Sequence, residues 1–155
     1  MNYNSISRGY NELHGEEQRK KLNIIKQFLK VKPDDKLLDV GCGTGLSSEF
    51  DCFVVDLDPS INLLKQSKKN KVLGASEFLP FKNNSFDVVI SVTAIHNFDD
   101  KKKAIKEIIR VGKTKFCISI LKKSRFCGEI LALIKQSFNN PVVVEEELDL
   151  ICFSG

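Results

Sequence analysis

Apolar runs and amphipathic stretches alternate along the chain. Apolar residues recur at helical spacing in four stretches, which predicts helices over residues 16–30, 61–70, 101–111 and 126–138. Short, mainly apolar runs predict strands over residues 37–40, 53–56, 72–77, 86–92, 115–121, 141–146 and 148–153. Strands that alternate with helices favour an α/β fold with a doubly wound, mostly parallel sheet. We therefore predict a three-layer α/β/α sandwich with a seven-stranded sheet, in which the C-terminal hairpin contributes one antiparallel strand.

The length of the chain sets its domain organisation. A chain of 155 residues is long enough for one domain with a substantial core. Residues 1–15 are polar, show no clear period and are expected to be irregular. We predict one domain over residues 1–155, divided into an N-terminal cap segment and helix (1–35), a central core (36–121), and a C-terminal helix and hairpin (122–155).

Composition and charge set limits on the function. Hydrophobic residues make up 42% of the chain and charged residues 28%, as in ordinary globular proteins, and the formal charge of +4 permits a nucleic-acid partner without requiring one. The five cysteines form no C-x-x-C pair, which argues against a disulfide scaffold or a zinc site, so no metal is predicted. The N-terminus lacks a signal pattern, and no apolar run approaches the roughly 20 residues that a membrane span needs. We expect a cytoplasmic protein with no membrane partner.

A glycine-rich turn follows the first predicted strand, in the sequence Leu37-Leu38-Asp39-Val40-Gly41-Cys42-Gly43-Thr44-Gly45. Glycine permits backbone conformations that a Cβ forbids, and it lets a ligand approach the main chain. A strand that runs through such a turn into a helix presents N–H groups to an anion, as nucleotide sites do. The spacing Gly-x-Gly-x-Gly meets only half of the dinucleotide fingerprint, so a plain tight turn stays open as an alternative.

A second buried strand, which begins at Phe53, ends in acidic residues. In doubly wound sheets an acid at the tip of the second strand accepts hydrogen bonds from the ribose of a bound adenosine. The segment Asp58-Pro59-Ser60 instead fits the start of a helix, where Asp58 or Ser60 would act as a cap. The fit is good for Asp58-Pro59, so we assign these residues to capping and Asp56 to a ligand.

Two further segments complete a family pattern. The motif Leu-Pro-Phe-x-x-x-Ser-Phe-Asp-Val-Val-Ile-Ser spans residues 79–91, and the pair His96-Asn97 follows that strand. Together with the glycine turn and the motif Val-Val-Asp-Leu-Asp-Pro-Ser over residues 54–60, these segments resemble the Rossmann-like (class I) S-adenosylmethionine-dependent methyltransferases. The chain is most similar to the ubiquinone/menaquinone-biosynthesis methyltransferase-like group. The resemblance covers residues 36–121, and the four motifs in this order are very specific to the family.

The resemblance implies that residues 36–121 bind S-adenosylmethionine as cofactor. Asp56 would bind the ribose and Leu57 would lie on the adenine face, while Asp39 would orient the turn or, through water, the ligand's ammonium group. The other residues that the resemblance assigns to the cofactor are Gly41, Gly43 and Gly45 at the methionyl part, Ser76 and Glu77 at the adenine edge through backbone groups, Ser91, and Tyr10. Tyr10 would pack over the ligand from the N-terminal segment, and a surface position for it stays equally open.

The chain departs from the family at two places. Ala75 stands where an aspartate commonly accepts a hydrogen bond from adenine, a missing contact worth on the order of 1 kcal/mol. Only residues 46–52 separate the glycine turn from the next strand, where relatives usually have a longer helix. Because Leu46, Phe50 and Phe53 are still apolar, we expect a homodimer or a small activator subunit to cover them. The alternative is that the N-terminal helix packs closer and fills the space.

The catalytic assignment concerns one histidine. Methyl transfer from a sulfonium mainly requires that two partners be bound and aligned, because the leaving thioether is neutral. His96 is the one candidate general base near the strand ends, since imidazole titrates close to neutral pH. The alternative is that His96 only shapes the pocket.

The sequence around these motifs narrows the class of methyl acceptor. No Asn-Pro-Pro-Tyr-type tetrapeptide follows the fourth strand, which weakens methylation of exocyclic amines. A large acceptor, either RNA or a protein of the translation machinery, would supply walls that this compact chain lacks and would contact the basic clusters 19–21, 101–103 and 122–125. The alternatives are a small-molecule methyltransferase and a non-catalytic binding protein with this fold. An NAD-dependent oxidoreductase would need the longer glycine spacing and a substrate domain.

Overall fold

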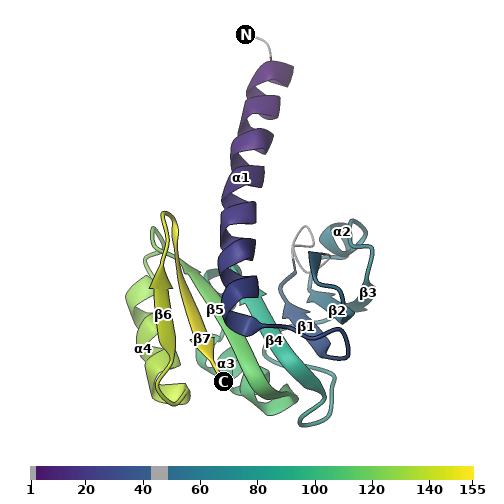
Figure 1. Ribbon diagram of the computed structural model, residues 1–155, viewed down its shortest axis with the longest axis vertical. Coiled ribbons are helices and arrows are strands. Elements are labelled where there is room, and N and C mark those ends of the chain that lie inside the picture. The colour runs from purple at the N-terminus through teal and green to yellow at the C-terminus, as the bar shows by residue number, and fades with distance from the viewer. Residues whose placement is uncertain (1–2, 43–48) are drawn as a thin grey trace.

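The sheet has the predicted architecture. The computed structural model describes residues 3–42 and 49–155, with side chains from residue 15 onward in those ranges. Seven strands form one sheet in the order β3-β2-β1-β4-β5-β7-β6 (Figure 1). Their bounds are β1 (Lys36–Val40), β2 (Phe53–Asp58), β3 (Asn70–Leu73), β4 (Phe86–Val92), β5 (Gly112–Leu121), β6 (Val142–Glu145) and β7 (Asp149–Ser154). Strand β7 pairs antiparallel with both of its neighbours, and the other pairs are parallel, so the predicted antiparallel strand is confirmed.

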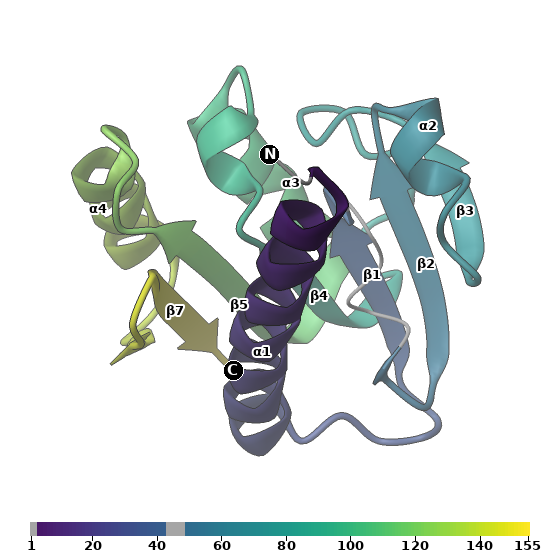
Figure 2. The same cartoon turned by 90° about the horizontal axis from the view of Figure 1, so that it is seen from above.

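Helices cover the two faces of this sheet. Helix α1 (Tyr3–Leu29) lies against one face, and helices α3 (Lys101–Val111) and α4 (Cys127–Ser137) lie against the other (Figure 2). A short α2 (Ile61–Leu64) follows β2, and a 3₁₀ turn, η2 (Ile95–Asn97), follows β4. The α/β/α sandwich is therefore confirmed.

Alternation along the strands builds a separate core on each face. Leu38 and Val89 pack in the core under α3 and α4, whereas their neighbours Leu37 and Val88 pack in the core under α1. This is the period of two that a β-strand imposes on a sheet buried on both faces. Asp39 falls on the α1 side by the same alternation, because Leu38 and Val40 both belong to the opposite core.

Helix α3 shows how the sequence fixes a helix here. Asp100 is its N-cap and accepts a hydrogen bond from the Lys103 amide at 3.0 Å, as its position in the sequence predicts. The buried residues of the helix recur three and four positions apart and are Ala104, Ile105, Ile108 and Val111. The predicted bounds, 101–111, match the observed ones.

Three predicted elements have other bounds. Helix α1 begins at Tyr3, so the expectation of an irregular segment over residues 1–15 is wrong, and the first turns of α1 extend beyond the sheet (Figure 1). Helix α2 ends at Leu64 instead of residue 70, because the amides of Gln66 and Ser67 donate to carbonyls only three residues back. The third strand runs over Asn70–Leu73 instead of 72–77, and the Asn70 side chain donates to Val54 O at its start.

The space after β1 is filled in part by α1. Phe50 is only 3% exposed and packs with Leu22, Ile25 and Leu29 of α1. Phe53 is 52% exposed, and Leu46 lies outside the described residues. The closer packing of the N-terminal helix, one of the two alternatives, therefore accounts for Phe50. None of the described helices is long and apolar enough to cross a membrane.

Phe50 and Phe53 provide a matched test of this packing. We expect Phe50→Ala to lower the free energy of unfolding by about 3–5 kcal/mol, because it leaves a cavity between α1 and the sheet. Phe53→Ala should cost less than about 1 kcal/mol, since half of that side chain is already in water. Urea denaturation of both variants measures the difference. Equal losses would show that α1 does not close over Phe50.

Candidate active site

A pocket opens at the carboxyl ends of β1 and β2, where open α/β sheets bind ligands. Its volume is about 110 Å³, and its lining residues are Gly41, Leu57, Pro59, Ala75, Ser76, Glu77, Asn97, Phe98 and Asp99. The structure thus brings together four of the predicted cofactor residues: Gly41, Leu57, Ser76 and Glu77. The segment Asn97–Asp99 was not predicted as lining. Its position directly after His96, at the end of β4, was the signal that could have found it.

Gly41 permits a close contact that defines one end of this pocket. Its φ is +73°, a left-handed conformation that favours glycine. A Cβ at Gly41 would lie 2.8 Å from Ala94 Cβ and 3.3 Å from the Phe98 ring. The Gly41 amide donates to Leu57 O at 2.8 Å, which joins the ends of β1 and β2. The packing of the described residues around position 41 therefore requires glycine there.

Helix α3 holds the loop on the other side of the pocket. The Leu79 amide donates to Glu107 Oε1 at 3.0 Å, and the Arg110 guanidinium donates to the carbonyls of Leu79 and Phe81 at 2.9 and 2.7 Å. Hydrogen bonds from Arg110 and from the Leu79 amide hold the pKa of Glu107 below its ordinary value, so the pair stays charged. Glu77 Oε1 accepts a hydrogen bond from the Asp100 amide at 3.3 Å. These contacts fix the loop that carries Ala75, Ser76 and Glu77.

Asp39 and Asp56 are buried neighbours on adjacent strands. The two residues are in register between β1 and β2, and both are at most 2% exposed. Burial, together with the negative charges of Asp39, Asp56 and Asp58, raises the pKa of the Cys42 thiol, which keeps Cys42 protonated. The carboxyl ends of β1 and β2 therefore form an electronegative corner beside the glycine turn. Neither Asp39 nor Asp56 lines the described pocket.

Ser67 holds Asp56, a role that the sequence reading missed. The Ser67 hydroxyl donates to Asp56 Oδ2, and Ser67 Oγ accepts from the Lys69 amide at 3.1 Å. A serine that bonds its own downstream backbone competes with helix formation, which agrees with the early end of α2. Only the polar character of this position, in a segment expected to be helical, signalled such a contact. The cap of α2 is Ser60, whose Oγ accepts from the Leu63 amide, and Asp58 Oδ1 accepts from the Ser60 amide. The N-cap is therefore Ser60, the other candidate, and not Asp58.

The other predicted cofactor residues lie elsewhere. Ser91 is fully buried and donates to Val40 O at 2.9 Å, so it joins β4 to β1 and does not line the pocket. Tyr10 is in α1, and its side chain lies outside the described residues, as do Gly43 and Gly45. The roles of these residues toward a cofactor stay predictions.

His96 lies in η2 at the carboxyl end of β4. Its side chain is half-buried, and its Nδ1 is buried with no hydrogen-bond partner in the described part of the chain. Burial lowers the pKa of His96 below its ordinary value, and Lys101 acts in the same direction while the Asp149 carboxylate opposes them. The imidazole is therefore neutral at neutral pH, the form that can accept a proton.

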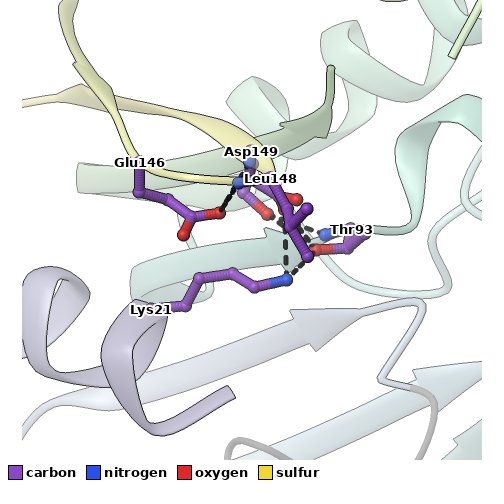
Figure 3. A network of polar contacts seen from close by, with 6 residues as sticks. Lys21, Thr93, Glu146, Leu148 and Asp149 are labelled. Carbon is purple, nitrogen blue, oxygen red and sulfur yellow. Dashed lines mark hydrogen bonds and ion pairs between the residues drawn. The ribbon is translucent and has the colours of Figure 1, made fainter. Parts of the chain in front are cut away.

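A buried polar cluster lies at the same end of the sheet (Figure 3). Lys21 Nζ donates to Thr93 Oγ1 at 3.0 Å and to Asp149 Oδ2 at 3.3 Å, and Thr93 Oγ1 donates to the same Asp149 oxygen at 2.6 Å. The Ser119 hydroxyl accepts from the Thr93 amide at 2.8 Å and lies 3.2 Å from Thr93 Oγ1. Lys21 and Asp149 are 3% and 0% exposed. The cluster joins α1 to the ends of β4, β5 and β7.

Thr93 holds a backbone conformation that the cluster stabilises. Its φ is +50°, which is rare for a β-branched residue. Such strain persists only where neighbouring contacts determine the conformation, and it concentrates at functional sites. The sequence reading missed Lys21, Thr93, Ser119 and Asp149. It placed Lys21 in an exposed basic cluster, which the structure corrects.

The comparison with known proteins identifies the family. The methyltransferase domain family matches residues 38–115, half of the chain. The chain belongs to this family. The predicted membership of the class I, S-adenosylmethionine-dependent methyltransferases is thereby confirmed. No group of three His, Cys, Asp or Glu side chains in the described part of this methyltransferase is placed to hold a metal ion.

Two curated relatives show the range of acceptors among similar proteins. The methyltransferase is 34% identical over 130 residues to the ubiquinone/menaquinone biosynthesis C-methyltransferase UbiE of Wigglesworthia glossinidia brevipalpis, which covers 72% of this chain and 52% of that protein. It is 31% identical over 116 residues to the tRNA (carboxymethyluridine(34)-5-O)-methyltransferase of Saccharomyces cerevisiae, which covers 68% of this chain and 41% of that protein. The chain thus spans about half the length of these relatives.

A solved structure shares the fold over most of the chain. The putative methyltransferase in complex with the Haloferax volcanii Trm112 methyltransferase activator superposes with a TM-score of 0.74. The match covers 96% of this methyltransferase and 94% of that chain at 14% sequence identity, so it shows a common fold.

Proposed function

We propose that the methyltransferase binds S-adenosylmethionine across the carboxyl ends of β1 and β2 and transfers its methyl group to an RNA acceptor. The observation that carries the cofactor proposal is the electronegative corner of Asp39 and Asp56, in register and buried beside the glycine turn. S-adenosylmethionine carries a sulfonium and an ammonium, both of which this corner would attract. The adenine would lie in the pocket between Leu57 and the loop of Ser76 and Glu77.

The proposed residue roles follow from this orientation of the ligand. Asp56, held by Ser67, would accept hydrogen bonds from the ribose hydroxyls, and Asp39 would lie nearer the methionyl ammonium. Gly41, with Gly43 and Gly45, would pass the main chain close to the ligand. Ala75 offers no polar side chain to the adenine, so the ring edge would depend on backbone groups of Ser76 and Glu77. Ser91 would act without touching the ligand, because its hydroxyl donates to Val40 O and fixes the end of β1.

Methyl transfer at this site needs alignment and a route for one proton. S-adenosylmethionine would supply an activated methyl group with a neutral thioether as the leaving group, and the acceptor O–H or N–H would attack it. The acceptor's proton would pass to His96, whose imidazole is neutral at neutral pH. The fold contributes mainly by holding nucleophile, carbon and sulfur in line.

Exposed basic residues favour an RNA acceptor. Arg19 and Lys20 lie on α1, Lys102 lies at the start of α3, and Lys123 and Arg125 follow the end of β5. The start of α3 and the end of β5 lie at the carboxyl edge of the sheet, and Lys21 brings its part of α1 to the same end. Clustered cations at one edge suit a phosphate backbone, and the likeness to a tRNA methyltransferase supports the same acceptor class.

A small lipophilic acceptor is the alternative. The likeness to a quinone-pathway C-methyltransferase favours it. A non-catalytic binding protein with this fold is disfavoured by the acids, the pocket and the neutral His96 found together at one edge. A protein of the translation machinery as acceptor is separated from RNA by the labelling experiment below.

A partner subunit stays a prediction. The solved relative with an activator subunit is the precedent for a small activator. The apolar surface on which we based this expectation is smaller than the sequence suggested, because Phe50 is buried by α1. Several apolar side chains at the β2–β3 end are nevertheless exposed, namely Phe53, Ile61, Leu73 and Phe78. A homodimer or an activator would cover them.

The first test is cofactor binding by titration calorimetry. We expect a dissociation constant in the micromolar range for S-adenosylmethionine, or roughly −8 kcal/mol. Asp56→Asn should weaken binding about 10- to 100-fold, or about 1.5–3 kcal/mol, because the amide removes the charge and one acceptor from the ribose. Asp87→Asn is the matched control, since Asp87 accepts from the Lys36 amide at the opposite edge of the sheet. Equal affinities for both variants would place the ribose elsewhere.

The acceptor class is tested by mass spectrometry. The protein and S-adenosylmethionine with a deuterated methyl group are incubated with RNA, protein and small-molecule fractions of a cell extract. We expect the label in RNA, because the basic edge attracts phosphate. The Asp56→Asn variant controls for non-enzymatic methylation. Label confined to small molecules would instead support the quinone-like alternative, and label confined to protein would contradict the RNA proposal.

The role of His96 is tested by the pH dependence of turnover. Turnover should fall as the pH falls through the pKa of His96, since the protonated ring accepts no proton. Because burial lowers that pKa, the midpoint should lie below the ordinary value of about 6.5. His96→Asn should lower turnover about 10²- to 10⁴-fold and leave calorimetric cofactor affinity nearly unchanged. Wild-type turnover in this variant would return His96 to a pocket-shaping role.

A further inference from the structure

Two buried polar atoms near the site are left without partners. Asp149 Oδ2 accepts hydrogen bonds from Lys21 and Thr93, but Asp149 Oδ1 is buried and has no partner among the described residues. The same holds for His96 Nδ1. Buried polar atoms in proteins almost always have a partner, so each such case calls for an explanation. Here the two atoms are complementary, because a carboxylate oxygen only accepts and an imidazole nitrogen can donate.

The fold places these two atoms in the same region. Asp149 is the first residue of β7 and pairs with Leu121, the last residue of β5. Thr93 directly follows β4 and bonds to Asp149 through its side chain, and His96 comes three residues later in η2. The charged groups that act on His96 are Asp149 from β7 and Lys101 from α3. Asp149 is thus the carboxylate among the described residues whose charge acts on His96.

We propose that Asp149 is a positioning residue for His96, with Oδ1 accepting a hydrogen bond from His96 Nδ1–H directly after a small ring rotation or through one water. This inference rests on the proposed role of His96 as the base. The bond fixes the tautomer, so that Nε2 carries the lone pair. Nε2 would then be the nitrogen that takes the proton of the methyl acceptor. Asp149 stabilises the imidazolium that forms.

The remaining members of the cluster hold Asp149 in place. Lys21 compensates its charge inside the protein, where an isolated carboxylate would be costly. The Thr93 hydroxyl donates its one proton to Asp149, so the Ser119 hydroxyl donates to Thr93 Oγ1. Glu146 Oε1 accepts from the amides of Leu148 and Asp149 at 3.0 and 2.6 Å and fixes the start of β7 (Figure 3). With Oδ2 occupied twice, Oδ1 is left for His96.

Nuclear magnetic resonance of the imidazole nitrogens tests this directly. The chain has two histidines, so ¹⁵N-histidine labelling gives two sets of signals, and a His14→Gln variant assigns them. We expect neutral His96 in the wild type to be mainly the Nδ1–H tautomer. In Asp149→Asn the tautomer should shift toward Nε2–H and the pKa of His96 should fall, because the negative charge is removed. Lys101→Met is the control of opposite sign and should raise that pKa.

Folding and function are controlled separately. Because Asp149→Asn leaves the Lys21 ammonium buried without its counter-charge, the double variant Lys21→Met/Asp149→Asn repeats the measurement with both charges removed. An unchanged His96 pKa in the folded variants, or a wild-type Nε2–H tautomer, overturns the proposal. Neither measurement uses cofactor or turnover. A failure to bind S-adenosylmethionine would therefore count against the proposed function and leave this inference standing.

Discussion

The contact of Gly41 with Ala94 and Phe98 is the constraint on which the site depends. A Cβ at Gly41 would lie 2.8 Å from Ala94 Cβ, so only glycine allows the segment after β4 to close onto the end of β1. That segment carries His96 and, directly after it, the pocket residues Asn97–Asp99. The close approach of Gly41 to Ala94 and Phe98 therefore sets the position of both the pocket and the candidate base.

Buried charge at this edge is distributed unevenly. Asp39 and Asp56 lie side by side on β1 and β2, and their charge adds to burial in raising the pKa of the nearby Cys42 thiol. At the β4–β5 end, the Asp149 carboxylate is compensated by Lys21 from α1. Breaking such a buried pair by removing one partner costs about 3–5 kcal/mol, because the remaining charge has no solvent. The N-terminal helix is thus held to the sheet by apolar packing and by this ion pair.

The spacing of apolar residues predicted the bounds of those elements whose own sequence shows a clear helical or strand period. Strand β4 and helix α3 match their predicted bounds, because a buried strand and an amphipathic helix both show clear periods. Helix α2 was overestimated, since the Ser67 hydroxyl that ends the helical segment makes its bond to Asp56, eleven residues earlier in the chain. The start of α1 was also missed, because no apolar period marks residues 3–15.

The candidate site likewise contains residues that the sequence indicated and residues that only the fold brings together. The glycine turn indicated Gly41 directly, and the family resemblance carried by the local motifs indicated Leu57, Ser76 and Glu77, all of which line the pocket. Lys21 and Asp149 are 128 residues apart in the chain. The sequence around each of them gives no indication that the two side chains pair. Lys21 belongs by sequence to a basic run that would ordinarily be solvated. Only the fold, which brings the start of β7 beneath α1, converts it into a buried partner.

The two groups of charges suit the two halves of the proposed reaction. In the proposed binding mode, the positive charge of the cofactor would lie beside the electronegative corner of Asp39 and Asp56. The proton released by the methyl acceptor would then carry positive charge toward His96. A carboxylate that is already held in place stabilises a nearby group that gains positive charge, because no reorganisation is needed. Buried charges interact more strongly than exposed ones. Asp149 lies at the end of the sheet where that charge arrives, and its hydrogen bonds from Lys21 and Thr93 fix it there before the reaction begins.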